Sequence, residues 1–171
     1  MIRLATAADA PRLVDLMRKL AAFEGYADRF AVTVNELHAR GFSTERPKEF
    51  VAWIAQRDGE PCGYAVAYVV PFTFDLRPTV VVKELFVEAC ARGNGCGSRL
   101  FAAIARFARS IDARLLRWQV LPDNDAAKRF YARAGGRADP AWESWVLDLD
   151  HRGLSGSKSS PTSGAVHPYS R

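Results

Sequence analysis

The residues best suited to chemistry form a glycine-rich segment that follows an apolar run of the chain. This segment is Arg92-Gly93-Asn94-Gly95-Cys96-Gly97-Ser98. Glycine lets the main chain approach a ligand closely, and a helix beginning near Ser98 would direct amide N–H groups and a partial positive charge at an anion. We predict a phosphate-binding loop here, although a tight turn between a strand and a helix would have the same composition.

Two familiar phosphate motifs do not match this segment. A P-loop requires Gly-Lys-Ser/Thr after four intervening residues, and the dinucleotide fingerprint beginning at Gly93 requires a third glycine where Ser98 stands. A phosphate site in this loop therefore has to be of another kind.

The elements that must position this loop are predicted from hydrophobic periodicity. Helices are expected after Thr6, from Thr33, from Ser98 and from about Asn124 to Ala134. The hairpin loop around Asp58-Gly59 is expected to be slightly long. Strands are predicted over residues 2–4, 50–56, 63–70, 79–87, 115–121 and 145–149. This order predicts an α/β fold with a mixed sheet flanked by helices.

Length and composition place limits on the architecture. The chain has 171 residues, of which 49% are hydrophobic and 25% charged, which suits one globular domain. We assign residues 1–151 to that domain and predict a disordered Ser/Gly-rich tail over 152–171. No apolar stretch approaches the roughly 20 residues of a membrane span, and no signal peptide is evident, so a cytoplasmic location is expected.

Cysteine, histidine and charge patterns bear on the class of ligand. The three cysteines and three histidines show no metal-ligand spacing, so we predict no metal site. Residues 92–137 hold ten Lys/Arg against three Asp/Glu. A positive field confined to one part of the chain favours a compact polyanion over nucleic acid, and no stacking aromatics are interleaved with these arginines. The alternative is that the arginines only form solvated helix faces.

Two motifs in the same order resemble those of the GNAT superfamily of N-acetyltransferases. Arg92-x-x-Gly95-x-Gly97 resembles the acetyl-CoA pyrophosphate loop, and Asn124-x-x-Ala127-x-x-Phe130-Tyr131 resembles the second signature of that family. The resemblance extends from residue 2 to 147. Segments 19–24 and 118–121 are similar to the diamine branch, whose members acetylate spermidine/spermine or thialysine.

The resemblance implies a sheet that splays at a cofactor cleft, and it assigns roles to residues. Tyr131 would protonate the departing thiolate, although it lies on an apolar stripe and packing alone would also explain it. Phe23 and Glu24 would bind the amine, but a surface carboxylate at a helix end is an alternative for Glu24. The residues expected to bind acetyl-CoA are Leu85, Phe86, Val87, Arg92, Gly93, Asn94, Gly95, Cys96, Gly97, Ser98, Asn124, Asp125, Ala126 and Ala127.

Glu84 is the candidate for taking a proton from the ammonium group of the acceptor, directly or through water. An amine with a pKa of about 10 is almost fully protonated at neutral pH, so a base is needed. The alternative is an ordinary strand carboxylate. The diamine branch tends to have two consecutive acids here, whereas this chain has Lys83 before Glu84. Because neighbouring strand residues face opposite ways, we expect that Glu84 cannot replace an acid at position 83.

These observations predict an acetyl-CoA-dependent N-acetyltransferase that transfers the acetyl group directly to a primary amine. The expected acceptor is a small cationic di- or polyamine-like molecule. Acetylation of a protein amine or of another small amine is an alternative, as is a CoA-binding module without turnover. We expect no nucleic-acid or membrane partner, and a homodimer is implied only by the resemblance.

Overall fold

The computed structural model describes residues 1–71, 75–141, 143–147 and 149. The chain divides into two compact units, Met1–Leu121 and Pro122–Arg171, and each is described by itself. The predicted tail, residues 152–171, lies outside the described residues. Among the helices that the structure describes, none is long and apolar enough to cross a membrane.

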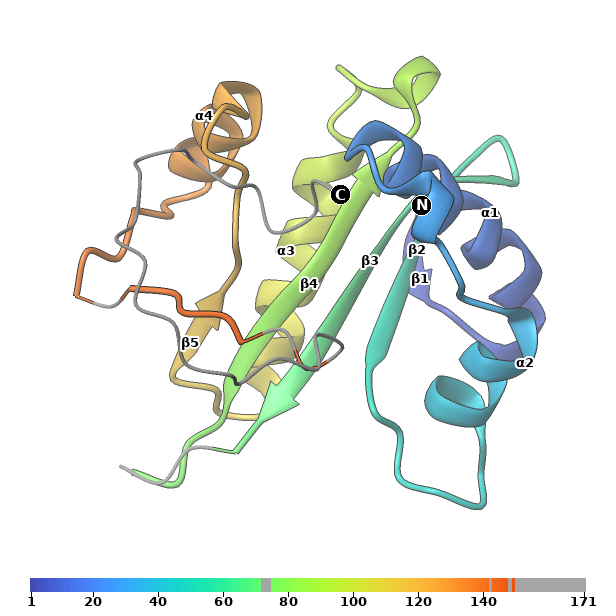
Figure 1. The fold of residues 1–171 in the computed structure, drawn as a ribbon, viewed down its shortest axis with the longest axis horizontal. Helices are drawn as coiled ribbons and strands as arrows, with labels where there is room; N and C mark the ends of the chain where they lie inside the picture. Colours follow the sequence, from blue (N-terminus) through green and yellow to red (C-terminus); the bar gives the residue numbers. More distant parts are fainter. Residues whose placement is uncertain (72–74, 142, 148, 150–171) are drawn as a thin grey trace, which may run out of the picture. The chain divides into compact units, whose positions relative to one another are not determined.

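The first unit is built on a five-stranded sheet with the order β1-β2-β3-β4-β5 (Figure 1). Its strands are β1 (Ile2–Leu4), β2 (Val51–Arg57), β3 (Glu60–Val70), β4 (Thr79–Val87) and β5 (Leu115–Arg117). The first three pairings are antiparallel, and β4 pairs with β5 in parallel. The predicted mixed sheet is therefore confirmed.

The hairpin between β2 and β3 is tighter than predicted. Its loop is only Asp58 and Gly59, and Arg57 pairs with Glu60 directly across it. Both loop residues have positive φ, 51° and 86°, which is the backbone of the two-residue turns that match strand twist. The expectation of a longer loop was wrong because β3 tolerates Pro61 next to a register shift, where the missing N–H does no harm.

One face of the sheet is covered by the N-terminal helical segments. These are η1 (Ala7–Asp9), α1 (Ala10–Phe23), η2 (Ala27–Arg29), α2 (Val34–Leu37) and η3 (His38–Phe42). The predicted stripe of α1 is buried: Leu13, Leu16 and Leu20 pack in one cluster with Tyr64 and Phe86 of the sheet. The capping box between Thr33 and Glu36 opens α2 as predicted.

The other face is covered by α3 (Cys96–Ser110), which follows β4 through η4 (Ala89–Ala91) (Figure 1). Leu100 and Ile104 are fully buried against this face. Trp53 of β2 contacts Phe107 of α3, with ring centroids 5.4 Å apart. The amphipathic helix predicted after the glycine loop is therefore present, and its apolar side packs against the sheet behind β4 (Figure 1).

Two predicted strands differ from the structure. β5 ends at Arg117 instead of continuing to Leu121, since Trp118 packs edge-on against Phe101 of α3 at 5.2 Å. The expected strand over 145–149 is wrong, because the described residues 145–147 and 149 are not in a strand and their side chains are exposed. A strand needs a neighbour for its backbone hydrogen bonds, which apolar composition alone does not supply.

Candidate functional site

The glycine loop joins β4 to α3 and differs in one respect from the prediction. Gly93 and Gly95 have φ of 79° and 72°, and Gly95 is the N-cap of α3. The helix therefore begins at Cys96, two residues before the expected Ser98. Left-handed backbone at Gly95 allows the chain to turn into the helix this early, because glycine has no Cβ to clash there.

The first turn of α3 presents amide N–H groups. Those of Cys96, Gly97 and Ser98 have no carbonyl four residues earlier in the helix, whereas the Arg99 N–H binds Gly95 O at 3.0 Å. The Cys96 side chain is buried in the core beneath α3 and is not available to a ligand. A 15-residue helix also has a positive dipole end at this point, which suits an anion.

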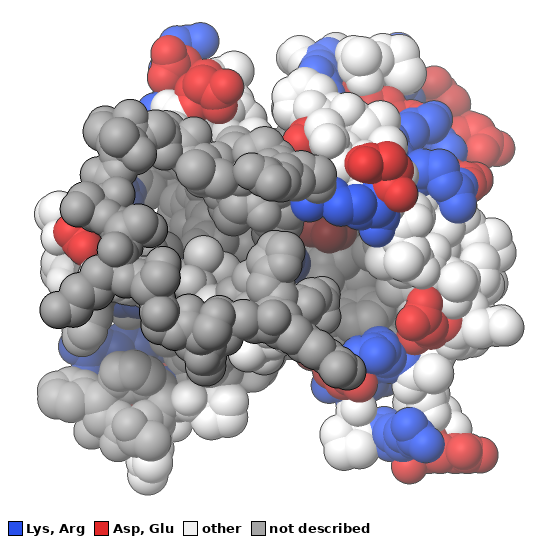
Figure 2. Space-filling view, viewed as in Figure 1, with Lys and Arg blue, Asp and Glu red and all other residues white. Residues whose placement is uncertain are grey.

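Arg99 adds a formal positive charge to the loop. Its Nη2 lies 3.4 Å from Cys96 Sγ, and a Cβ placed on Gly95 would lie 3.1 Å from its Nη1. The guanidinium is therefore folded back over the first turn. In Figure 2, basic and acidic side chains are interspersed over the α1–α2 part of the visible face.

The main chain of β4 is the second feature of the site. Only Thr79–Val81 pair with β5, so within the described part of the chain the following residues have no strand on that side. Leu85 packs toward α3, whereas Phe86 is buried on the α1 face. Residues 85–87 pair with β3 on one side, and Val87 O also accepts a hydrogen bond from Arg92, so the pantetheine contacts that the resemblance implies for this segment stay a prediction.

A β-bulge interrupts β4 at Lys83. Val66 of β3 pairs with Glu84, and the next β3 residue, Ala67, pairs with Val82, so Lys83 is the extra residue. Val82 packs in the core beneath α3, whereas Glu84 bonds to Tyr64, which belongs to the opposite core. The simple alternation assumed from the sequence was wrong at this point, because a bulge changes which face each following residue occupies.

Glu84 lies on the α1 face of the sheet and is half-buried. Burial raises the pKa of its carboxyl, while the hydrogen bond from Tyr64 and the positive charge of Lys83 oppose that rise. The Tyr64 hydroxyl donates to Glu84 Oε2 at 2.8 Å. A carboxylate held in this way can accept a proton more readily than an exposed one.

Glu24, which follows the last residue of α1, faces the same region. Its negative charge raises the pKa of Glu84. It also contributes to the raised pKa of Tyr64, after burial, Glu84 and Tyr26. The charge of a carboxylate 60 residues away in the sequence therefore acts on Glu84. Carboxylates that interact in this way favour a cationic ligand, because the ligand charge relieves their mutual repulsion.

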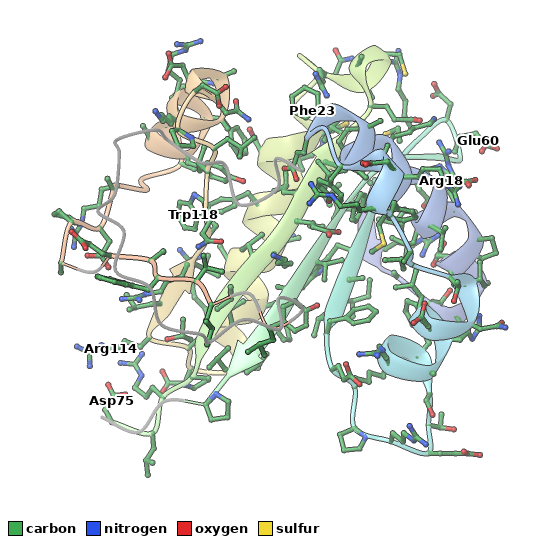
Figure 3. The ribbon with its side chains drawn as sticks, viewed as in Figure 1. Arg18, Phe23, Glu60, Asp75, Arg114 and Trp118 are labelled. Atoms are coloured by element: carbon green, nitrogen blue, oxygen red, sulfur yellow. The ribbon has the colours of Figure 1, made fainter. Side chains whose placement is uncertain are left out.

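Phe23 lies at the C-terminal end of α1 and is exposed (Figure 3). Its ring is 5.4 Å from the guanidinium carbon of Arg92, which is also 5.9 Å from the Phe86 ring. Arg92 Nε donates to Val87 O at 2.9 Å, closing the end of β4. Phe23 is thus next to Arg92, the first residue of the glycine loop, and Arg92 connects the end of α1 with the end of β4.

The second unit contains α4 (Asp125–Arg133), which carries the other predicted site residues. Asn124 is its N-cap, and the Asn124 side chain accepts the Ala127 N–H at 3.0 Å. Tyr131 is half-buried, and its ring contacts that of Phe130 edge-on at 4.9 Å. The cofactor contacts of residues 124–127 and the acid role of Tyr131 stay predictions.

A family model described as "Acetyltransferase (GNAT) family" matches residues 13–136, which include β4, the glycine loop and α4. The chain belongs to the GNAT acetyltransferase family. A thialysine N-epsilon-acetyltransferase of Bos taurus is 30% identical over 152 residues, covering 85% of this chain and 88% of that protein. The human spermidine/spermine N(1)-acetyltransferase-like protein 1 is 25% identical over 155 residues, 85% of this chain but 22% of that protein.

Solved structures show the same GNAT fold. A probable acetyltransferase superposes with a TM-score of 0.74 at 23% identity, covering 87% of this chain and 97% of that one. An aminoglycoside acetyltransferase from an uncultured soil metagenomic sample has a TM-score of 0.68 at 19% identity, with 87% and 93% covered. The predicted fold class is confirmed, and this GNAT protein is an acetyl-CoA-dependent N-acetyltransferase.

Three site features of this GNAT domain were missed by reasoning from the sequence. These are the bulge at Lys83, the bond from Tyr64 to Glu84, and Arg99 over the glycine loop. Arg99 was detectable, since it lies three residues into the helix after the loop. The bulge and the Tyr64 bond depend on the register between β3 and β4. This register cannot be predicted from the sequence of one strand alone.

Proposed function

We propose that this enzyme acetylates a small, positively charged primary amine that binds beside Glu84. The observation that carries the proposal is the half-buried Glu84 carboxylate on the strand that leads into the glycine loop. It accepts a hydrogen bond from Tyr64, and the charge of Glu24 acts on it. The names of the relatives, which act on thialysine or resemble spermidine/spermine acetyltransferase, support the same class of acceptor.

The first unit offers groups suited to acetyl-CoA. The amide N–H groups of Cys96, Gly97 and Ser98, together with Arg99, suit its diphosphate, and a side chain at Gly95 would crowd that cradle. The main chain of residues 85–87 suits the amide groups of the pantetheine arm. Bound there, acetyl-CoA supplies a thioester whose carbonyl carbon is open to attack by an amine.

In this proposal, Glu84 takes a proton from the acceptor ammonium, directly or through one water, and so frees the nitrogen lone pair. The raised pKa of Glu84, caused by burial, makes the carboxylate a stronger base at neutral pH. The nitrogen then attacks the thioester carbonyl carbon and forms the carbon–nitrogen bond. As the carbon–sulfur bond breaks, Tyr131 gives its proton to the leaving sulfur and takes up the second proton that the nitrogen loses as the amide forms. Phe23 and Glu24 contribute to holding the acceptor beside the loop.

A second candidate acceptor is an amine that also carries a carboxylate, such as an amino acid with a side-chain amine. Lys83 favours this candidate. Its side chain is exposed on the bulge next to Glu84, and its positive charge would repel the second positive charge of a polyamine. A zwitterion would match the Lys83 and Glu84 pair, whereas a polyamine would be repelled by Lys83.

Thiol release with an amine panel tests both acceptor classes. Free CoA is measured with a chromogenic thiol reagent while spermidine, thialysine, lysine, an aminoglycoside and a peptide amine are compared. Release above the background hydrolysis rate, greatest for spermidine or thialysine and lost in Glu84→Gln, is the expected result. A preference for the peptide amine would contradict the small-amine proposal. If Lys83→Glu raises kcat/KM for spermidine and lowers it for thialysine, the zwitterion is favoured.

A further inference from the structure

We propose that Tyr64 is a positioning residue that holds the Glu84 carboxylate in one orientation for proton transfer. This role rests on the proposed function of Glu84 as the base. Tyr64 belongs to β3 and lies outside both sequence motifs, so the motif pattern does not point to it.

The geometry of Tyr64 suits a rigid support. Its side chain is completely buried, and its ring lies in the same core as Phe86, with centroids 6.3 Å apart. The hydroxyl reaches the edge of that core and donates to Glu84 Oε2 at 2.8 Å. A glutamate has several side-chain rotamers, and this bond selects one of them, leaving Oε1 to accept the substrate proton.

The bulge at Lys83 explains why Glu84 needs such support. By adding one residue to β4, it turns Glu84 onto the face where Tyr64 lies, at a point where the ladder with β3 is irregular. Without the phenol, the half-buried Glu84 carboxylate would lose part of its hydration and also lose the hydrogen bond that replaces it. The bulge and the tyrosine therefore act as a pair, one aiming the carboxylate and the other holding it.

Neighbouring titratable groups leave Tyr64 as a donor through neutral pH. The groups that face Glu84 or Tyr64 are Glu24 and Tyr26 after α1, Tyr68 on β3 and Lys83 on β4. Burial and the charge of Glu84 raise the pKa of both Tyr64 and Tyr68, so their hydroxyls stay protonated. Since a donor stabilises the charged carboxylate, removing it raises the pKa of Glu84.

The test compares Tyr64→Phe with Tyr68→Phe, using two readouts. Tyr68 lies on the same strand and face but is 37% exposed, and phenylalanine preserves the ring at either position. In Tyr64→Phe, the acidic limb of the profile of kcat/KM against pH is expected to move up by about one pH unit. Below that limb kcat/KM should fall about tenfold, and above it kcat/KM should recover. The second readout is the Glu84 carboxyl titration by ¹³C NMR, assigned with Glu84→Gln, which is expected to move in the same direction.

The outcomes separate positioning from structure. An unchanged Glu84 titration in Tyr64→Phe, whatever the loss of kcat/KM, overturns the proposal, as does an equal shift in Tyr68→Phe. Failure of the proposed function looks different, because Glu84→Gln would then keep wild-type turnover while the Glu84 titration still moves in Tyr64→Phe.

Discussion

Replacing Gly95 by alanine tests the phosphate role of the glycine loop directly. Gly95 has φ of 72°, and an added Cβ would lie 3.1 Å from Arg99 Nη1. Gly59 provides a matched control, because its φ is 86°, it belongs to the β2–β3 hairpin, and an added Cβ there meets no atom within 4 Å. The two variants therefore share backbone strain and differ in what surrounds the new methyl group.

The expected energies follow from that difference. A left-handed backbone costs an L-residue roughly 1–2 kcal/mol, and the reduced entropy of the unfolded chain offsets roughly 0.4–1 kcal/mol of it. Both variants should therefore lose about 1 kcal/mol of unfolding free energy. In Gly95→Ala the Arg99 side chain must also move, and misaligning one charge-assisted bond to phosphate weakens acetyl-CoA binding roughly 10- to 100-fold.

Chemical denaturation and calorimetry with CoA measure the two effects. Only Gly95→Ala should raise the Kd for CoA. Acetyl-pantetheine lacks the diphosphate, so kcat/KM with this substrate should show the same small decrease in both variants. If Gly95→Ala binds CoA as tightly as Gly59→Ala does, the loop is a structural turn and the phosphate assignment is refuted.

Three further changes have expected results of their own. Glu84→Gln should lower kcat/KM roughly 10²- to 10⁴-fold in the amine assay. It should also stabilise the fold at pH 7, with the gain vanishing below about pH 4, because the folded-state pKa of Glu84 is raised by burial and its ionisation opposes folding. Asp9 has the opposite sign: its two 2.7 Å bonds from Arg3 lower its pKa, so Asp9→Asn should cost about 2 kcal/mol at pH 7 and progressively less in thermal melts below about pH 4. Leu100→Ala, in the fully buried contact of α3 with the sheet, should cost roughly 2–5 kcal/mol without changing the Kd for CoA beyond the effect of partial unfolding.

Local patterns in the sequence determined most of the elements and the type of ligand loop. The 3.6-residue stripe of α1, the capping box at Thr33 and the β-branched run of β4 each depend on neighbours within a few residues. The glycine loop and its order before the Asn124 segment were likewise visible, because spacing along the chain is the whole signal. The fold class and the family follow from these features.

Only the tertiary structure decided how Glu84 is presented. The face it occupies depends on the register of β4 against β3, and one extra residue at Lys83 reverses that face. Its partners, Tyr64 and Glu24, are 20 and 60 residues away in the sequence, so no local pattern could pair them. The residue types of the site were therefore readable from the chain, whereas their orientation and protonation arise from packing and burial, which exist only once the strands have paired.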